Sequence, residues 1–245
     1  MLNILNQIEF ILVRPSHPGN IGATARAMKN MGLTQLRLVA PSLFPHPDAT
    51  ARAAGADDVL SEAKIFQTLT DALAGSNYVI ATSARARRLD WPVMTPREAA
   101  ERVLERACAG RAAIVFGAER SGLSNEDLEQ CNAAIAIPTD PSFSSLNLAA
   151  AVQIMAYEIW SRGAPRSPIP NSGDKDDLPV NHAKMEGLYE HLERALSHSG
   201  FFDSGNPEIV MRRLRRLFSR AGLTQRELNI LRGFCKSVLA LRKPP

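Results

Sequence analysis

Short runs of apolar residues recur along the first two thirds of the chain, separated by segments in which apolar residues return every third or fourth position. The runs have the length of strands, and the spaced segments have the period of helices. Strands are expected at residues 10–13, 36–39, 78–81, 112–116 and 134–137. Because apolar strands alternate with helices, we expect an α/β fold with a mostly parallel sheet that flanking helices bury on both faces.

The helices fill the intervals between these strands. They are expected at residues 21–31, 49–55, 69–74, 96–108 and 125–131, and a further helix follows residues 144–147. Asn20 is the expected N-cap of the first helix, and Gly32 is expected to end it. Ser145 or Asn147 is expected to cap the helix that follows them, whereas Val59 and Leu60 are expected to be extended.

A change in composition divides the chain. Proline, glycine and charged residues concentrate between residues 163 and 178, which is typical of a boundary between domains. Three helical segments follow, and Thr224 with Glu227 predicts a capping box at the start of the last one. We expect a catalytic domain at residues 1–162, a linker at 163–183 and a small basic helical extension at 184–245.

Composition narrows the class of protein. Hydrophobic residues make up 45% of the 245 residues, which is enough for a sizeable core. No apolar run is long enough to cross a bilayer, and residues 1–9 lack the pattern of an export signal. The three cysteines are far apart and the five histidines lack metal-ligand spacing, so we expect a cytoplasmic protein without disulfides, membrane contact or a required metal.

The net charge of +4 conceals an asymmetry. Residues 205–245 hold ten Lys and Arg against two Asp and Glu, so the rest of the chain is net negative. Clustered positive charge suggests a polyanionic partner, most simply RNA. A solvated helix face explains the same cluster equally well.

Four loops follow expected strands and would meet at one edge of the sheet, where parallel sheets bind ligands. They comprise residues 15–22, 82–88, 117–123 and 144–147. Guanidinium groups there could hold phosphates through paired hydrogen bonds, or form only surface ion pairs. The arginines concerned are Arg26, Arg85, Arg87, Arg88 and Arg120. The loop at 144–147 could likewise bind a ligand or merely cap its helix.

Several familiar motifs are absent. The glycines at 19 and 22 do not have the spacing of a dinucleotide-binding fingerprint, which disfavours a nucleotide-dependent oxidoreductase. Residues 117–122 have the outer glycine spacing of a phosphate-binding loop, but Leu123 and Ser124 stand where that loop needs Lys and Ser or Thr. Ser145 is not in a nucleophile elbow.

Three segments taken together resemble the SPOUT class of RNA methyltransferases, in its TrmH-type branch. They are Asn20-Ile21-Gly22-Ala23-Thr24-Ala25-Arg26, residues 114–123 with Gly117-Ala118-Glu119-Arg120-Ser121-Gly122-Leu123, and residues 137–147 with Ser145-Leu146-Asn147. The resemblance covers residues 8–162 and, more loosely, the rest. It implies a deep trefoil knot at roughly 112–160, a homodimer whose active site both subunits build, and S-adenosylmethionine as cofactor.

By matching motifs, the resemblance also implies residue roles. Cofactor contacts would come from Thr82, Ser83, Ala84, Gly117, Ile137, Ser144, Ser145 and Leu146. Arg26 matches the family's catalytic arginine, and Ser145 and Asn147 would orient ribose and cofactor. Guanidinium stays protonated in proteins, so we expect Arg26 to grip a phosphate and orient the hydroxyl instead of acting as a base. For Glu119 and Arg120, an ion pair that fixes their loop is as plausible as a catalytic role.

The implied reaction is 2′-O-methylation of a ribose in tRNA, at cytidine or uridine in position 32 of the anticodon loop. Arg26, Arg85, Arg87, Arg88 and Arg120 would contact the RNA. The alternatives are methylation of a ribosomal RNA, or an RNA-binding protein that has this fold without the chemistry.

Overall fold

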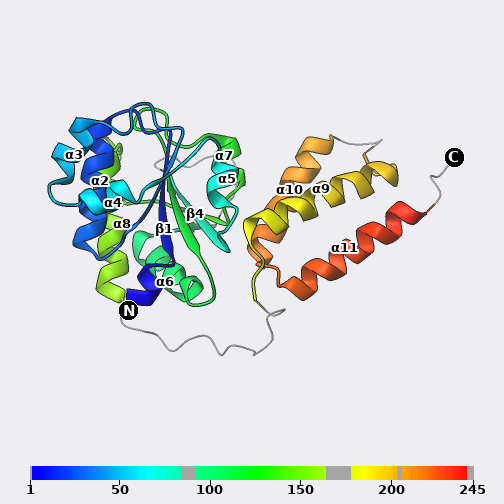
Figure 1. Ribbon diagram of the computed structural model, residues 1–245. Helices are drawn as coiled ribbons and strands as arrows, with labels where there is room; N and C mark the ends of the chain where they lie inside the picture. Colours follow the sequence, from blue (N-terminus) through cyan, green and yellow to red (C-terminus); the bar gives the residue numbers. More distant parts are fainter. Residues whose placement is uncertain (1, 84–91, 164–177, 203–205, 242–245) are drawn as a thin grey trace. The chain divides into compact units, whose positions relative to one another are not determined.

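The computed structural model describes residues 2–83, 92–163, 178–202 and 206–241 (Figure 1). The chain divides into two compact units, Met1–Ile169 and Pro170–Pro245. The linker bounds expected at 163–183 fall largely outside the described residues and stay a prediction.

The first unit is built on a parallel sheet. Its strands are β1 (Ile8–Val13), β2 (Gln35–Val39), β3 (Lys64–Phe66), β4 (Tyr78–Thr82), β5 (Val93–Met94), β6 (Ala112–Phe116) and β7 (Ala133–Ile135). Over the described residues, their order is β3-β2-β1-β6-β4-β7-β5, and every neighbouring pair is parallel. The expected α/β class is confirmed, although the short strands β3 and β5 escaped prediction because two or three residues make no recognisable apolar run.

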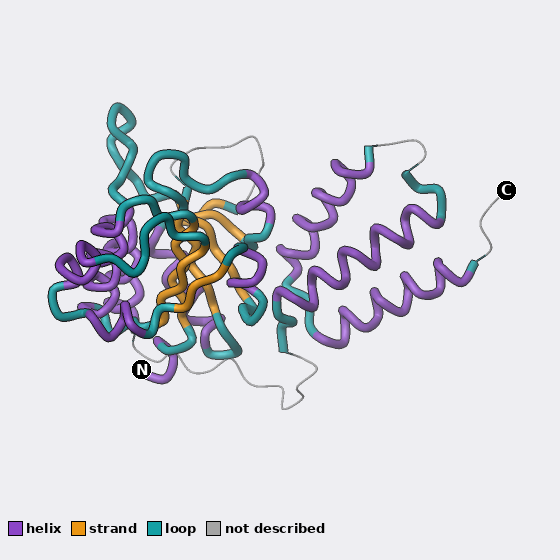
Figure 2. Tube along the Cα trace, turned by 45° about the horizontal axis from the view of Figure 1, so that its top comes forward, coloured by secondary structure: helices purple, strands orange, loops and turns teal. Residues whose placement is uncertain are grey.

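Helices cover both faces of this sheet, as Figures 1 and 2 show. The larger core packs the sheet against α2 (Pro18–Asn30), α3 (Pro47–Ala53), α4 (Asp57–Ser61), α6 (Pro96–Ala107) and α8 (Leu148–Arg162). The smaller core packs it against α5 (Leu69–Leu73) and α7 (Asn125–Glu129). A short helix, α1 (Leu2–Leu5), precedes β1. The central strands β1 and β6 are buried along their whole length, as expected of a sheet covered on both faces.

Two local predictions are wrong. Helix α2 begins at Pro18, with His17 and not Asn20 in the N-cap position, because proline is preorganised for the first helical residue. Val59 and Leu60 are helical in α4, where both are buried and two aspartates in the first turn favour the helix start. Asn147 does cap α8, accepting hydrogen bonds from the N–H groups of Ala149 and Ala150.

The second unit is a small helical bundle of α9 (His182–His198), α10 (Pro207–Ala221) and α11 (Gln225–Ala240). Its core includes Leu188, Leu192, Leu228 and Cys235. The expected capping box of Thr224 and Glu227 is present at the start of α11. Within the described ranges, no helix is long and apolar enough to cross a membrane. The trefoil knot at 112–160 stays a prediction.

Gly22 allows a close approach that fixes α2 against α3. A Cβ atom at Gly22 would lie 2.0 Å from the carbonyl oxygen of Ala49, whereas one at Gly233 in α11 would meet nothing within 4 Å. We expect Gly22→Ala to lower the free energy of unfolding by ~2–3 kcal/mol through overpacking. The matched variant Gly233→Ala should be neutral or stabilising by ~1 kcal/mol. Denaturant titration of both variants tests this, and equal stabilities would contradict the close packing.

Candidate active site

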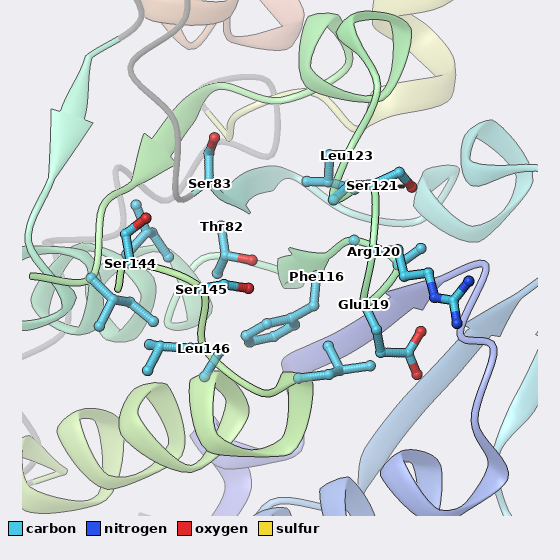
Figure 3. A pocket seen from close by; sticks show the side chains of 17 residues that line it. Thr82, Ser83, Phe116, Glu119, Arg120, Ser121, Leu123, Ser144, Ser145 and Leu146 are labelled. Carbon is cyan, nitrogen blue, oxygen red and sulfur yellow. Dashed lines mark hydrogen bonds between the residues drawn. The ribbon is translucent and has the colours of Figure 1, made fainter. Parts of the chain in front are cut away.

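A pocket opens at the carboxyl edge of the sheet, where β4, β6 and β7 end beside the start of α8 (Figure 3). Seven of the residues expected to contact a cofactor line it: Thr82, Ser83, Gly117, Ile137, Ser144, Ser145 and Leu146. Phe116 and Leu148 add apolar surface, and Arg120 adds a charged side chain. Three distant loops thus converge as the topology predicts, while the contact with a cofactor stays a prediction.

Other expected site residues lie elsewhere. Ala84, Arg85, Arg87 and Arg88 fall outside the described residues. Asn147 is at the start of α8, next to the pocket but not among its lining residues. Arg26 is exposed on α2 and does not line the pocket within one chain.

Gly117 lets the third loop fold back over the end of β6. A Cβ atom at this position would lie 2.2 Å from the carbonyl carbon of Gly122 and 2.3 Å from the nitrogen of Leu123. The return is closed by the Gly122 N–H, which donates to the Ala118 carbonyl at 2.8 Å. Gly122 has a φ of +68°, a conformation in which glycine is favoured. The backbone of Gly117 therefore packs directly against the backbone of Gly122 and Leu123, and any residue with a side chain at position 117 would clash there.

The Glu119 carboxylate joins this third loop to the first. It accepts hydrogen bonds from the Ser16 N–H at 2.9 Å, the Ser16 hydroxyl at 2.8 Å and the His17 N–H at 3.1 Å. The side-chain amide of Asn20 donates a further bond at 2.9 Å. Glu119 thus holds the start of α2, where an anion is favoured. The ion pair between Glu119 and Arg120 that we considered is not formed, and Figure 3 shows both side chains across the pocket from Ser144.

Asn20 extends the connection to the fourth loop. The amide nitrogen of Asn147 donates to the side-chain oxygen of Asn20 at 3.0 Å, while the oxygen of Asn147 caps α8. Glu119, Asn20 and Asn147 therefore form one chain of hydrogen bonds through three loops. Sequence reasoning assigned Asn20 only a capping role, and its place in the first family motif was the one signal of a wider role.

These bonds keep Glu119 ionised. Partial burial acts to raise its pKa, but the hydrogen bonds from Asn20 and Ser16 outweigh that effect and lower the pKa from 4.5 to about 2. A similar device holds Asp127 of α7: burial acts to raise its pKa, and hydrogen bonds from Arg14 and Ser124 lower it overall. Both carboxylates are thus anchors of the loops that follow β1 and β6.

Arg26 and Arg120 contrast with these paired residues. Both are exposed, and neither makes a hydrogen bond or ion pair with any described residue. Unpaired guanidinium groups are suited to binding phosphate, and of these two only Arg120 lines the pocket of its own chain. Within the described residues, no cluster of His, Cys, Asp and Glu that could hold a metal is found.

Comparison with known proteins agrees with this arrangement. The sequence model of the SpoU rRNA Methylase family matches residues 7–157, and that of the tRNA methyltransferase TrmJ C-terminal domain matches residues 183–244. The chain belongs to the SpoU methylase family. Relatives named TrmJ match over both units of the chain.

Three relatives of this SpoU methylase illustrate the similarity. A tRNA (cytidine/uridine/adenosine-2′-O-)-methyltransferase TrmJ from Pseudomonas aeruginosa is 48% identical over 238 residues, covering 94% of this chain and 93% of that protein. A tRNA (cytidine/uridine-2′-O-)-methyltransferase TrmJ from Yersinia pestis (strain Pestoides F) is 46% identical, covering 99% and 95%. The crystal structure of TrmJ from Z. mobilis ZM4 has a TM-score of 0.81 at 40% identity, covering 94% and 98%.

The low pKa of Glu119 predicts how this SpoU methylase responds to acid. A carboxylate with a depressed pKa stabilises the folded state fully above its unfolded value near 4.5 and loses that contribution as pH falls toward 2. We expect Glu119→Gln to lower the free energy of unfolding by ~1–2 kcal/mol at neutral pH, because the amide cannot accept all these bonds. The gap between variant and native protein should shrink as the pH falls below about 4.5.

Denaturant titrations over a pH series measure that gap. Glu62→Gln is the matched control, because Glu62 is exposed and its side chain makes no hydrogen bond or ion pair with a described residue. A gap for Glu119→Gln that stays constant from neutral pH to pH 3 would contradict the role of the ionised carboxylate.

Proposed function

We propose that this SpoU methylase transfers a methyl group from S-adenosylmethionine to the 2′-hydroxyl of cytidine or uridine at position 32 in the anticodon loop of tRNA. The observation that carries the proposal is the match over both units to relatives named as tRNA 2′-O-methyltransferases. The family model for the first unit is named for ribosomal RNA, but the second unit matches a tRNA methyltransferase domain. The match of the second unit therefore supports tRNA as the substrate.

The pocket suits the proposed cofactor. Hydroxyl groups of Thr82, Ser144 and Ser145 stand near apolar surface from Phe116 and Leu146, and the Gly117 backbone approaches closely. S-adenosylmethionine supplies a methyl group activated on a positively charged sulfur. Since that charge disappears during transfer, an apolar wall favours the reaction, and polar groups at the rim can hold the rest of the molecule.

The chain's own residues then position the acceptor. The ribose oxygen must approach the methyl carbon in line with the bond that breaks, so orientation supplies much of the rate. Arg26 stays protonated, which suits it to hold a neighbouring phosphate and stabilise negative charge on the oxygen. Ser145 and Asn147 orient the ribose and the cofactor from the start of α8.

Arg26 reaches the pocket in this proposal from a second subunit. Helices α2 and α8 lie side by side: Asn20 contacts Asn147 at their starts, and a Cβ at Gly32 would lie 3.0 Å from Trp160 at their ends. Arg26 is exposed on this pair, together with Tyr157 and Trp160 of α8. Exposed aromatic residues on the same pair of helices as a free arginine favour an interface, and we propose that pairing two copies through it brings Arg26 of the partner subunit to the pocket.

Substitution of Arg26 tests its role. We expect Arg26→Ala to lower kcat on tRNA ~100-fold or more, because a charged donor to the reacting region is lost. Arg26→Lys keeps the charge without the paired hydrogen bonds and should lose ~10-fold or more. Cofactor binding, measured by calorimetry, should be unchanged in both variants, and near-normal turnover by Arg26→Lys would contradict a required paired grip.

Mixing two inactive variants tests whether the site is shared. In a dimer of Arg26→Ala and Ser145→Ala subunits, one pocket would keep both Ser145 and Arg26 of the partner subunit. Random reassociation should therefore restore about a quarter of native activity. If both residues serve the pocket of their own subunit, mixing restores nothing and the shared site is wrong.

The second unit offers a basic face for the tRNA backbone. Met211, Leu214 and Phe218 of α10 contribute to the core of this unit. Arg213 and Arg220 are exposed and make no hydrogen bond or ion pair with a described residue. Seven residues apart, they lie on the same side of α10 about 10 Å from each other. Arg215 differs, because it forms two hydrogen bonds with Glu186 at 2.7 and 2.8 Å and lies over the ring of Tyr189.

These different surroundings predict different effects. The double change of Arg213 and Arg220 to Gln should weaken tRNA binding and reduce the slope of log affinity against log salt by ~1.4–1.8. Stability and cofactor binding should stay unchanged. Arg215→Gln should instead lower the melting temperature of the second unit, since it breaks a partly buried pair. Binding titrations at several salt concentrations measure the slope, and an unaltered slope in the double variant would remove this face from the tRNA interface.

A further inference from the structure

The side chain of Phe143 is not buried in the core of the folded chain. Its side chain is 79% exposed, the highest value among the large apolar side chains of the described residues. Exposing a ring of this size forgoes the free energy that burial would supply. Single exposed apolar side chains are common on protein surfaces, so exposure alone assigns no role to Phe143. Its place directly before Ser144, which lines the pocket, makes it a candidate for contact with a ligand.

The loop that carries Phe143 is fixed by its own hydrogen bonds. Asp140 accepts a bond from the Ser142 N–H at 2.7 Å, and the Phe143 N–H donates to the Asp140 carbonyl at 3.0 Å. Asp followed by Pro is a favoured start for such a turn, and Pro141 supplies the second position. The Thr139 hydroxyl also donates to the Ser144 carbonyl at 3.4 Å. The turn thus presents the ring outward instead of letting it collapse onto the core.

The position of the turn relates Phe143 to the reaction. The two residues that follow it, Ser144 and Ser145, line the pocket, and Arg120 stands on the opposite side (Figure 3). Arg120 has no partner among the described residues, so it can hold a phosphate. A ribose placed between them for methyl transfer would carry its phosphate toward one side and its base toward the other.

We propose that Phe143 stacks on the nucleobase of the nucleotide that is methylated. The proposal rests on the function proposed above, because it takes the ribose to enter this pocket. A loop nucleotide must leave its stack to enter a pocket, and aromatic side chains commonly replace the lost stacking in RNA recognition. The base is bonded to the sugar carbon next to the one that bears the 2′-hydroxyl, so it must lie close to the pocket mouth.

Stacking also fits a broad choice of base. An aromatic ring contacts the face of a base and does not read the hydrogen-bonding groups on its edge. Among the relatives, one is named for cytidine and uridine and another also for adenosine. Stacking on the face of the base would allow one active site to accept cytidine, uridine and adenosine alike.

The alternative partner for the Phe143 ring is a second subunit. Interface cores are contiguous apolar patches, whereas Phe143 is surrounded along the chain by Asp140, Ser142, Ser144 and Ser145, all exposed and polar. The exposed Tyr157 and Trp160 of α8 are three residues apart and so lie on the same side of that helix. The isolated ring on a polar turn therefore favours a nucleobase over protein.

Three substitutions separate the two occupants. Phe143→Ala should lower kcat/KM on tRNA by about tenfold to a hundredfold, mainly through KM. Phe143→Tyr should retain activity because it keeps the ring, whereas Phe143→Leu should behave like the alanine variant because it keeps only apolar bulk. Cofactor affinity and oligomeric state, measured by calorimetry and light scattering, should be unchanged. Ile65→Ala is the control: Ile65 is 49% exposed on β3, at the edge of the sheet far from the pocket in strand order.

A substrate without the base provides the direct test. Native protein should lose activity on tRNA whose target nucleotide keeps the ribose but lacks the base. Phe143→Ala should lose nothing further on that substrate, because the partner of the ring is already gone. The proposal is wrong if the losses of activity caused by Phe143→Ala and by the missing base add up, or if Phe143→Ala has normal activity on intact tRNA. It is also wrong if Phe143→Leu retains native activity while Phe143→Ala has an altered oligomeric state. If native protein fails to methylate tRNA at all, the proposed function itself is wrong.

Discussion

The hydrogen bonds received by the Glu119 carboxylate are the constraint on which the site depends. The loop after β1 and the loop after β6 are far apart in sequence. The Glu119 side chain joins them through Ser16, His17 and Asn20, and the ion pair of Arg14 with Asp127 adds a second connection. Asn20 then contacts Asn147 at the start of α8. Without an ionised acceptor in this position, three loops would have to find their relative placement through weaker contacts. The carboxylate is therefore a positioning group, and the pocket forms beside it.

Two carboxylates at the sheet show how surroundings decide a pKa. Glu9 of β1 is 2% exposed and pairs with Arg37 and Ser76, yet burial dominates and raises its pKa. Glu119 is more open, and donors at the start of α2 outweigh burial, so its pKa falls. Glu9 is thus held inside the core, where charge is disfavoured. Glu119 remains charged at the edge of the sheet, where the polar loops that bind a ligand need an anchor.

Sequence reasoning succeeded where structure is decided locally. The central strands are apolar runs, and the caps at Asn147 and Thr224 act on N–H groups within three residues. It failed where a distant contact decides: Asn20 bonds to residues 99 and 127 positions away, so its own neighbours could not reveal that role. The convergence of the loops at one pocket was predictable from parallel topology. The placement of Arg26 outside the pocket of its own chain was not, because the position of a residue after a strand does not fix the side of the following helix on which its side chain lies.

The described arginines fall into those that pair with a carboxylate side chain and those that do not. Arg14, Arg37 and Arg215 each face a carboxylate and act as parts of the folded structure. Arg26, Arg120, Arg213 and Arg220 face none among the described residues, and all four are exposed. Net charge alone cannot make this distinction, since every guanidinium counts equally. In an RNA-modifying enzyme, the positive charge available to the substrate is the part that the protein's own acids leave unpaired, and among the described residues that part includes exposed arginines on α2, on the pocket loop and on one side of α10.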